Sequence, residues 1–277
     1  MRKMGIGVQL FTLRNETASD FPGTLRHVAE LGYEGVEFAG YGGLSAEQMK
    51  DLLQETGLKA IGSHVGMQSL RENLQSEIDY LNTIGGKYLI CPHIAEEERQ
   101  TPEDWKRIFD FFEEVGQEAR RNGLTFAYHN HAFEFDIQVA GEFAFDAMYA
   151  NTSPDSVQVE MDVCWVKFAG QDPLAYIPKY AGRLPLLHLK DFNRDQEKID
   201  EINQMIAKQL GHNKFRYEMV TLELGQGEVP LVNVIAAASD AGVEWLIVEQ
   251  DMCLTNPPLQ SIANSMNWVK QNYLQLV

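Results

Sequence analysis

The chain has 277 residues, 44% of them hydrophobic, and 23 basic against 40 acidic residues give a formal net charge of −17. This size suits one large domain with a substantial core and lies in the range of α/β barrels. The strong negative charge argues against nucleic acid and anionic membrane surfaces as partners, because both attract Lys and Arg.

The remaining composition is typical of a protein from a reducing compartment. Cys91, Cys164 and Cys253 are scattered and form no CxxC pair, so we expect free thiols. We find no basic and apolar signal at the N-terminus and no run of about eighteen apolar residues. We therefore expect a cytoplasmic protein without a membrane span.

The first half of the chain alternates apolar runs with amphipathic segments. Strands are predicted at about residues 4–10, then ending at 38 and at 64, and at 88–91; helices are predicted at about 20–31, 45–56 and 68–84. Asp20 is a plausible N-cap of the first helix, and Ser45 with Gln48 has the spacing of a capping box.

The second half repeats this alternation until residue 192. Helices are predicted at about residues 101–121, 141–149 and 173–182, and strands from 124 and at 157–161 and 184–189. Some forty residues, about 192–230, then precede a helix at 231–241, a strand at 245–249 and a final helix from 257. This long insertion contains an amphipathic helix of its own, which makes it a candidate lid or homo-oligomer contact.

Eight strands alternating with helices predict a parallel sheet with right-handed crossovers. Eight such units close into a barrel, so we predict a single α/β domain over residues 1–277, a (β/α)₈ TIM barrel with an extended insertion after the seventh strand. In this fold the C-terminal ends of the strands converge on one axis.

Each predicted strand carries a polar residue near its C-terminal end. These residues are Gln9, Glu37, His64, His93, His129, Asp162, His188 and Glu249. Among them, two imidazoles and two carboxylates, from His129, Asp162, His188 and Glu249, suit a divalent ion such as Mn²⁺, Zn²⁺, Co²⁺ or Fe²⁺. Mg²⁺ stays among the expected ions, although it usually prefers more oxygen ligands.

Four segments carry a resemblance to a known family: YHNHAFEF (128–135), EMDVCWVKFAG (160–170), GRLPLLHLKD (182–191) and IVEQD (247–251). They resemble the xylose-isomerase-like TIM barrel superfamily of sugar isomerases and epimerases, and the similarity covers nearly the whole chain. The resemblance implies one divalent metal held by Glu, Asp, His and Glu from successive strands. Asp162, His188 and Glu249 match the last three, and His129 stands where the first Glu is expected. His131 and Glu134 are alternative first ligands.

The resemblance also implies a small carbohydrate substrate. Family epimerases move protons with two metal-bound carboxylates on opposite substrate faces, so we expect an isomerase or epimerase of a keto sugar or polyol. With His129 in place of one carboxylate, a lyase or dehydratase of a keto sugar, inosose or keto-glycoside is the alternative.

We assign hypothetical roles to the remaining polar residues. His131 is the preferred base, with Glu249 as its partner, and Lys190 holds a substrate oxygen or steadies the enolate. The expected substrate-binding residues are Gln9, Glu37, His64, His93, Glu134 and Trp165.

Two further functions compete with these. The AP endonuclease branch of the superfamily needs a His-rich three-metal cluster and a basic DNA face. Trp165 stands where that branch places a His, and the net charge of −17 also disfavours it. A non-catalytic sugar-binding barrel is the other alternative, and metal analysis discriminates among these.

Overall fold

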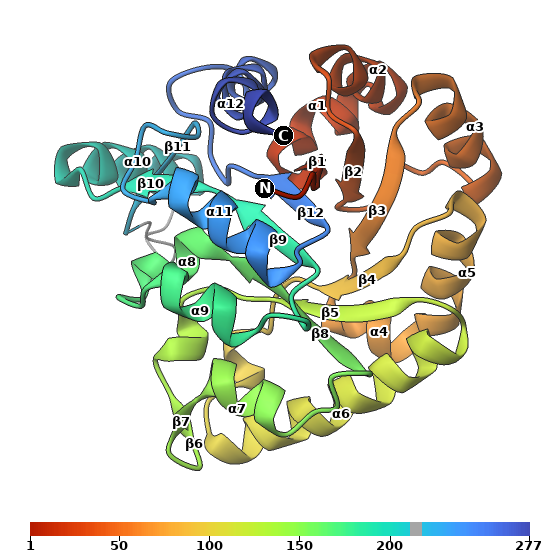
Figure 1. The fold of residues 1–277 in the computed structure, drawn as a ribbon, viewed down its shortest axis with the longest axis vertical. Coiled ribbons are helices and arrows are strands. Elements are labelled where there is room, and N and C mark those ends of the chain that lie inside the picture. The colour runs from red at the N-terminus through yellow and green to blue at the C-terminus, as the bar shows by residue number, and fades with distance from the viewer. Residues whose placement is uncertain (211–217) are drawn as a thin grey trace.

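The predicted barrel is confirmed. The computed structural model describes residues 1–210 and 218–277, and eight parallel strands close in the order β1-β12-β9-β8-β5-β4-β3-β2 (Figure 1). The strands are β1 (Gly5–Gln9), β2 (Gly35–Phe38), β3 (Lys59–His64), β4 (Tyr88–Cys91), β5 (Thr125–His129), β8 (Val157–Asp162), β9 (Leu186–Leu189) and β12 (Trp245–Val248).

Helices cover the outside of the barrel (Figure 1). They are α1 (Arg14–Ser19), α2 (Phe21–Leu31), α3 (Ala46–Thr56), α4 (Met67–Glu72), α5 (Leu74–Ile84), α6 (Pro102–Arg121), α7 (Ala144–Ala150), α8 (Val163–Phe168), α9 (Pro173–Lys179), α10 (Gln196–Leu210), α11 (Leu231–Ala241) and α12 (Pro258–Asn272). The predicted caps form, since Asp20 accepts from the Gly23 N–H and Ser45 with Gln48 makes a capping box. Within the described residues, no helix combines the length and apolarity needed to cross a bilayer.

Two predicted helices have different limits in the structure. The segment 68–84 is two helices, α4 and α5, because Asn73 leaves the helical region with φ −132° and ψ 17°. The helix expected from residue 141 begins at Ala144, because a small hairpin of β6 (Gln138–Val139) and β7 (Glu142–Phe143) precedes it. Gly141, with φ +91°, makes the tight turn between these strands.

The core has two parts. Most buried apolar side chains fill the space between strands and helices, and a small cluster fills the bottom of the barrel interior. This inner cluster consists of Ile61, Tyr88, Ile90, Ala127, Leu186 and Ile247. Toward the C-terminal ends of the strands, the inward-facing positions are polar instead. Leu186 and His188, two residues apart on β9, illustrate this change.

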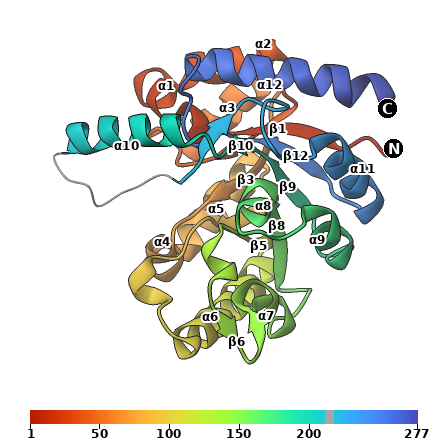
Figure 2. The same ribbon diagram turned by 90° about the vertical axis from the view of Figure 1, so that its left-hand side faces the viewer.

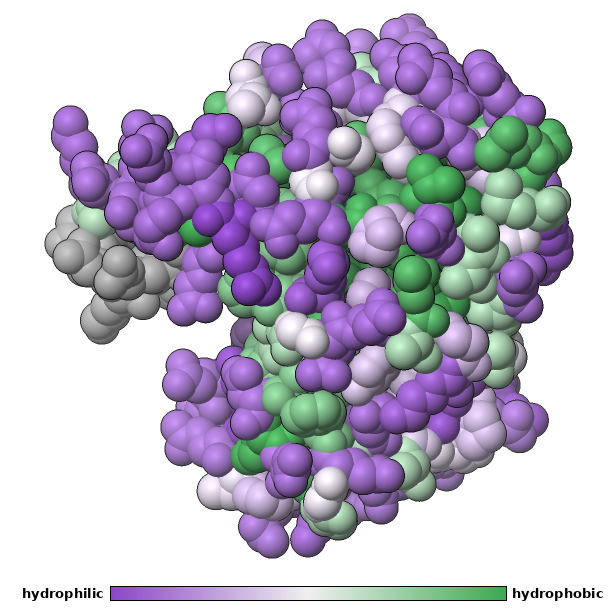
Figure 3. Space-filling view, turned by 60° about the vertical axis from the view of Figure 1, so that its left-hand side comes forward, coloured by the Kyte–Doolittle hydropathy of each residue, from purple (hydrophilic) through white to green (hydrophobic). Residues whose placement is uncertain are grey.

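The insertion after β9 forms a substructure of its own. A two-stranded antiparallel sheet of β10 (Asp191–Asn193) and β11 (Val220–Leu222) carries α10 between its strands. Ile199 and Ile202 of α10 pack on Val220 and Leu222. Figure 2 shows α10 projecting away from the barrel, and the projecting part in Figure 3 is mostly hydrophilic on the visible face. Residues 211–217 of the predicted insertion lie outside the described residues.

The Asp191 carboxylate, at the start of this insertion, binds the end of it. Asp191 accepts hydrogen bonds from the backbone N–H groups of Phe192, Gly225, Gly227 and Val229 at 2.9–3.0 Å. The Cβ of any residue replacing Gly227 would lie 2.3 Å from an Asp191 oxygen, so this close approach requires glycine. The Gly225-Gln226-Gly227 segment is therefore a structural turn bound to Asp191.

Candidate metal centre

Four side chains from neighbouring strands meet at the C-terminal mouth of the barrel. They are His129 at the end of β5, Asp162 at the end of β8, His188 on β9 and Glu249 just after β12. One nitrogen or oxygen atom from each lies within 4.8 Å of the others, and all four side chains are buried. His188 Nδ1 lies 3.0 Å from Glu249 Oε2, and His129 Nε2 lies 3.8 Å from Asp162 Oδ2. The structure thus brings together the four residues that the sequence suggested as ligands.

The orientation of Asp162 is fixed by the helix that follows it. Its Oδ1 accepts the backbone N–H groups of Cys164 and Trp165, at 2.8 and 3.1 Å, and so caps α8. Its Oδ2 faces the cluster, where it lies 3.0 Å from the Lys190 ammonium. One carboxylate oxygen therefore serves the fold, and the other is left for a cation.

A second polar layer lies beneath these residues. His64 Nε2 is 3.0 Å from Glu37 Oε2 and 2.9 Å from Glu160 Oε2, so this imidazole bridges two buried carboxylates. Gln9 donates to Glu37 Oε2 at 2.7 Å. Glu37 Oε2 also lies 2.9 Å from His188 Nε2. Glu37 and Gln9 are fully buried here rather than exposed to the mouth.

Glu160 is the main residue of this layer that the sequence interpretation missed. Its Oε2 lies 3.1 Å from His129 Nδ1, and the two residues are register partners on β5 and β8. The signal was present, because Glu160 precedes Asp162 by two residues and side chains two apart on a strand share a face.

The electrostatics of the two layers differ. Burial and the neighbouring His188 hold the pKa of His129 well below its usual value, so this imidazole is neutral, as a metal ligand must be. Burial alone would lower the pKa of His64, but Glu37 and Glu160 outweigh it and raise that pKa to about 9. His64 is therefore a cation between two carboxylates.

Lys190 is the single buried ammonium described at this mouth. Its Nζ lies 3.0 Å from Asp162 Oδ2, 2.8 Å from Glu249 Oε2 and 2.9 Å from Asp251 Oδ1. Burial would lower the pKa of Lys190, but these three carboxylates raise it well above its usual value. Asp251 was not predicted, although it lies two residues after Glu249. The Asp251 carboxylate is a partner of Lys190 that is not among the four candidate metal ligands.

A cavity of about 400 Å³ opens onto the cluster. It is lined by Phe11, Ala39, His64, Pro92, His93, His129, His131, Lys190, Glu249 and Asp251. Phe11, which the sequence interpretation also missed, is an exposed ring at its edge. His131 Nδ1 has no hydrogen-bond partner, and burial with the nearby Lys190 holds the pKa of His131 well below its usual value. His131 is thus a neutral imidazole with a free ring nitrogen beside the cluster.

Other residues expected at the site have different surroundings. Glu134 accepts from the Tyr128 hydroxyl at 2.5 Å and from the His131 backbone N–H at 2.9 Å, and it is fully buried outside the cavity. Trp165 does not line the cavity either, but its ring lies 5.3 Å from that of His131. These contacts favour a supporting role for both residues rather than direct substrate contact.

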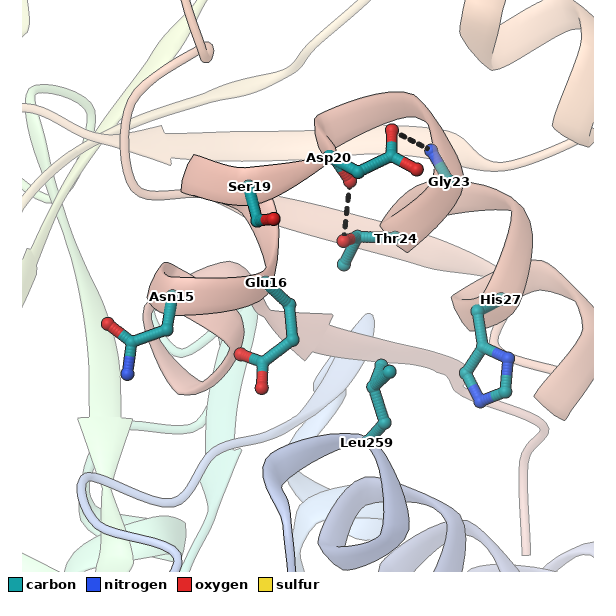
Figure 4. Close-up of a pocket in the computed structure, with 8 residues that line it drawn as sticks. All are labelled: Asn15, Glu16, Ser19, Asp20, Gly23, Thr24, His27 and Leu259. Atoms are coloured by element: carbon teal, nitrogen blue, oxygen red, sulfur yellow. Dashed lines mark hydrogen bonds between the residues drawn. The ribbon is translucent and has the colours of Figure 1, made fainter.

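A second cavity, of about 520 Å³, lies on the surface where α1 and α2 approach α12 (Figure 4). Its polar groups already serve the fold: Asp20 accepts from the Gly23 N–H at 2.9 Å, and its backbone carbonyl accepts from Thr24 Oγ1 at 2.7 Å. None of the clustered histidines and carboxylates of the barrel mouth lines it. We assign it no function.

The donor chemistry at the mouth fits a divalent ion. Two carboxylates neutralise a dication, and imidazole nitrogens suit Mn²⁺, Zn²⁺ or Co²⁺. Burial would lower the pKa of His188, but Glu160 and Glu37 raise it well above its usual value, so metal binding releases a proton from this ring. Lys190, now paired with Asp162 Oδ2, keeps Asp251 as a partner when a dication takes its place. His129 and Glu249 also border the cavity, which leaves one side of the cluster accessible to a substrate.

Fold and site together define a (β/α)₈ barrel with a buried cluster of histidines and carboxylates at its C-terminal mouth, the usual position of TIM-barrel active sites. The family model for the xylose isomerase-like TIM barrel matches residues 25–272, and the chain belongs to this family.

Among curated relatives, an inosose dehydratase of Geobacillus kaustophilus is 25% identical over 84% of this chain and 81% of its own length. One from Lacticaseibacillus casei is 26% identical over 65% of this chain, and the match covers 63% of that protein. Among solved structures, a sugar phosphate isomerase/epimerase from Parabacteroides distasonis superposes with a TM-score of 0.77 at 23% identity, covering 97% of this chain and 98% of that one. This structural likeness shows the fold.

Proposed function

We propose that the protein is a divalent-metal-dependent enzyme that removes a proton next to the carbonyl of a keto sugar, an inosose or a related polyol. The observation that carries the proposal is the convergence of His129, Asp162, His188 and Glu249 beside a cavity with a free imidazole, His131. A divalent ion held by the four residues supplies Lewis-acid chemistry, because it stabilises negative charge developing on a carbonyl oxygen.

The chain's own residues supply the proton chemistry. His131, neutral and unpartnered at Nδ1, accepts the α proton. Lys190 lines the same cavity and donates a hydrogen bond to a substrate oxygen. His93, whose ring lies 5.3 Å from that of His131, reads a substrate hydroxyl at the cavity wall.

Dehydration follows from this arrangement more readily than epimerisation. An epimerase of this family uses a metal-bound carboxylate on each substrate face, but here the imidazole of His129 stands in place of one of them, and His131 is the imidazole with a free nitrogen. In an elimination the α C–H electron pair forms the new double bond and the β C–O bond breaks. The imidazolium of His131 then returns its proton to the departing hydroxyl, which leaves as water. The relatives named inosose dehydratase support this choice.

Isomerisation or epimerisation of a keto sugar remains the second candidate, because it begins with the same proton removal. One experiment separates the two outcomes: incubation of the Mn²⁺-loaded protein in D₂O with inososes and keto sugars. A product lighter by one water supports dehydration. Recovered or epimeric sugar that carries carbon-bound deuterium supports isomerisation. Neither product with any inosose or keto sugar would contradict the proposed enzyme and favour a sugar-binding barrel.

A further inference from the structure

The two central histidines each connect the two polar layers through both ring nitrogens. His129 has Nδ1 3.1 Å from Glu160 Oε2 and Nε2 3.8 Å from Asp162 Oδ2. His188 has Nε2 2.9 Å from Glu37 Oε2 and Nδ1 3.0 Å from Glu249 Oε2. An imidazole that binds a metal ion is neutral and carries a proton on only one nitrogen. Each ring must therefore present its proton to one layer and its lone pair to the other.

Each layer could accept a cation on geometry alone. One compatible set is His64, His129, Glu160 and His188, and the other is His129, Asp162, His188 and Glu249. The side chains that already pair with the carboxylates distinguish the two sets. In the lower layer, Glu37 and Glu160 already share His64, whose Nε2 lies 3.0 and 2.9 Å from their Oε2 atoms. In the upper layer, Asp162 and Glu249 share the Lys190 ammonium, which keeps Asp251 as a partner when a dication replaces it.

We propose that Glu160 and Glu37, joined by His64, form a proton-holding layer that sets the tautomers of His129 and His188 for metal binding. Glu160 accepts the Nδ1–H of His129, so the Nε2 lone pair faces Asp162. Glu37 accepts the Nε2–H of His188, so the Nδ1 lone pair faces Glu249. Both carboxylates are positioning residues that act through a histidine, as outer carboxylates of metal sites do.

This arrangement accounts for the histidine at the end of β5. A glutamate there would bind a cation directly, whereas an imidazole has a second nitrogen that needs a partner when buried. Glu160 provides that partner from the next strand, in register with His129. His64 then lies between Glu160 and Glu37 and relieves the repulsion between them.

The first test measures binding of Co²⁺ or Mn²⁺ by titration calorimetry and the visible spectrum of the Co²⁺ form. Glu160→Gln and Glu37→Gln should each weaken binding about 10–100-fold and alter the Co²⁺ spectrum. The matched control is Glu223→Gln: Glu223 is equally buried but bonds Asn256 and Ser261, away from the histidines. The control should bind like the wild type, with one ion per chain.

The second test uses the wild type alone, so its result does not depend on whether a variant folds. In the ¹⁵N spectrum of the Zn²⁺-loaded wild type, His129 should carry its proton on Nδ1 and His188 on Nε2. Opposite tautomers would overturn the inference. So would unchanged affinity in both glutamine variants, or two bound ions in the wild type, which would make the lower layer a second metal site. The inference rests on the proposed metal centre: a wild type that binds no ion refutes both, whereas the other failures leave the proposed enzyme standing.

Discussion

Removal of the buried ammonium at the barrel mouth gives the sharpest test of the site's electrostatics. In metal-free protein, Lys190→Met leaves Asp162, Glu249 and Asp251 without their shared cation, which lies 2.8–3.0 Å from each. Loss of one partner from a buried ion pair costs about 3–5 kcal/mol. At roughly 2–4 °C per kcal/mol for a chain of this size class, the melting temperature should fall by about 6–20 °C.

The assay is thermal unfolding with EDTA and again with excess Mn²⁺. A dication between Asp162 and Glu249 replaces the missing positive charge, so Mn²⁺ should recover part of the loss. For scale, ligand at about 100 times its Kd adds about 2.7 kcal/mol to any protein that binds it only when folded. The matched control is Lys87→Met, because Lys87 pairs with Glu244 at 2.7 Å on the surface and should cost less than about 1 kcal/mol.

The reasoning fails if Lys190→Met in EDTA melts within the range of the Lys87→Met control. It also fails if Mn²⁺ stabilises the wild type but gives the Lys190 variant nothing. The first result would mean that the three carboxylates are not held together by Lys190, and the second that they do not accept a dication in its place.

Three further predictions follow from other parts of the mouth and its support. His131→Ala should keep its bound metal but lose about 10²–10⁴-fold in α-proton exchange with D₂O, measured by mass spectrometry; loss of the metal would make His131 a ligand. Burial raises the pKa of Glu134 from 4.5 to about 7, so the native state holds a proton that the unfolded chain releases. Stability should therefore fall as pH rises from about 4.5 to 7, by up to about 3 kcal/mol, and Glu134→Gln should remove that part of the pH dependence in urea titrations. Asp191→Ala leaves buried N–H groups without an acceptor, which costs about 1–3 kcal/mol for each group. The amides of Gly225 and Gly227 should therefore exchange faster with solvent than in the wild type, while β9 stays protected. Exchange of these amides at the wild-type rate would contradict the role given to Asp191.

The strands and their convergence could be predicted from sequence because both follow from local patterns and topology. A helix-ending glycine, an apolar run and a final polar residue recur along the chain, as at Gly32 and Glu37. Once these units are read as a closed barrel, Asp162, His188 and Glu249 must approach one axis. The convergence of the candidate metal ligands therefore follows without knowledge of any side-chain contact.

The sequence could not predict how deep in the barrel a side chain lies, or where a turn changes its direction. We expected Glu37 to contact substrate, but its side chain is fully buried one layer below the candidate ligands, with its Oε2 against His188. Glu134 lies in the 3₁₀ turn Phe133–Phe135, which directs it back toward Tyr128, so strand alternation does not apply. The proton positions on His129 and His188 depend on Glu160 and Glu37, and no spacing rule encodes them.

The hydrogen bonds between Asp191 and the end of the insertion have a consequence for how this protein could diversify. The insertion after β9 begins at Asp191, and the carboxylate of Asp191 accepts hydrogen bonds from the backbone of Gly225 and Val229 at its end. Between these two points, β11 bonds back to the segment after β12, since Thr221 Oγ1 donates to the Met252 carbonyl at 2.9 Å, whereas α10 packs on β10 and β11 and projects from the barrel (Figure 2). Substitutions confined to the exposed face of α10 would therefore leave the candidate metal centre undisturbed, so this helix is the place where a new binding specificity could arise beside an unchanged barrel mouth.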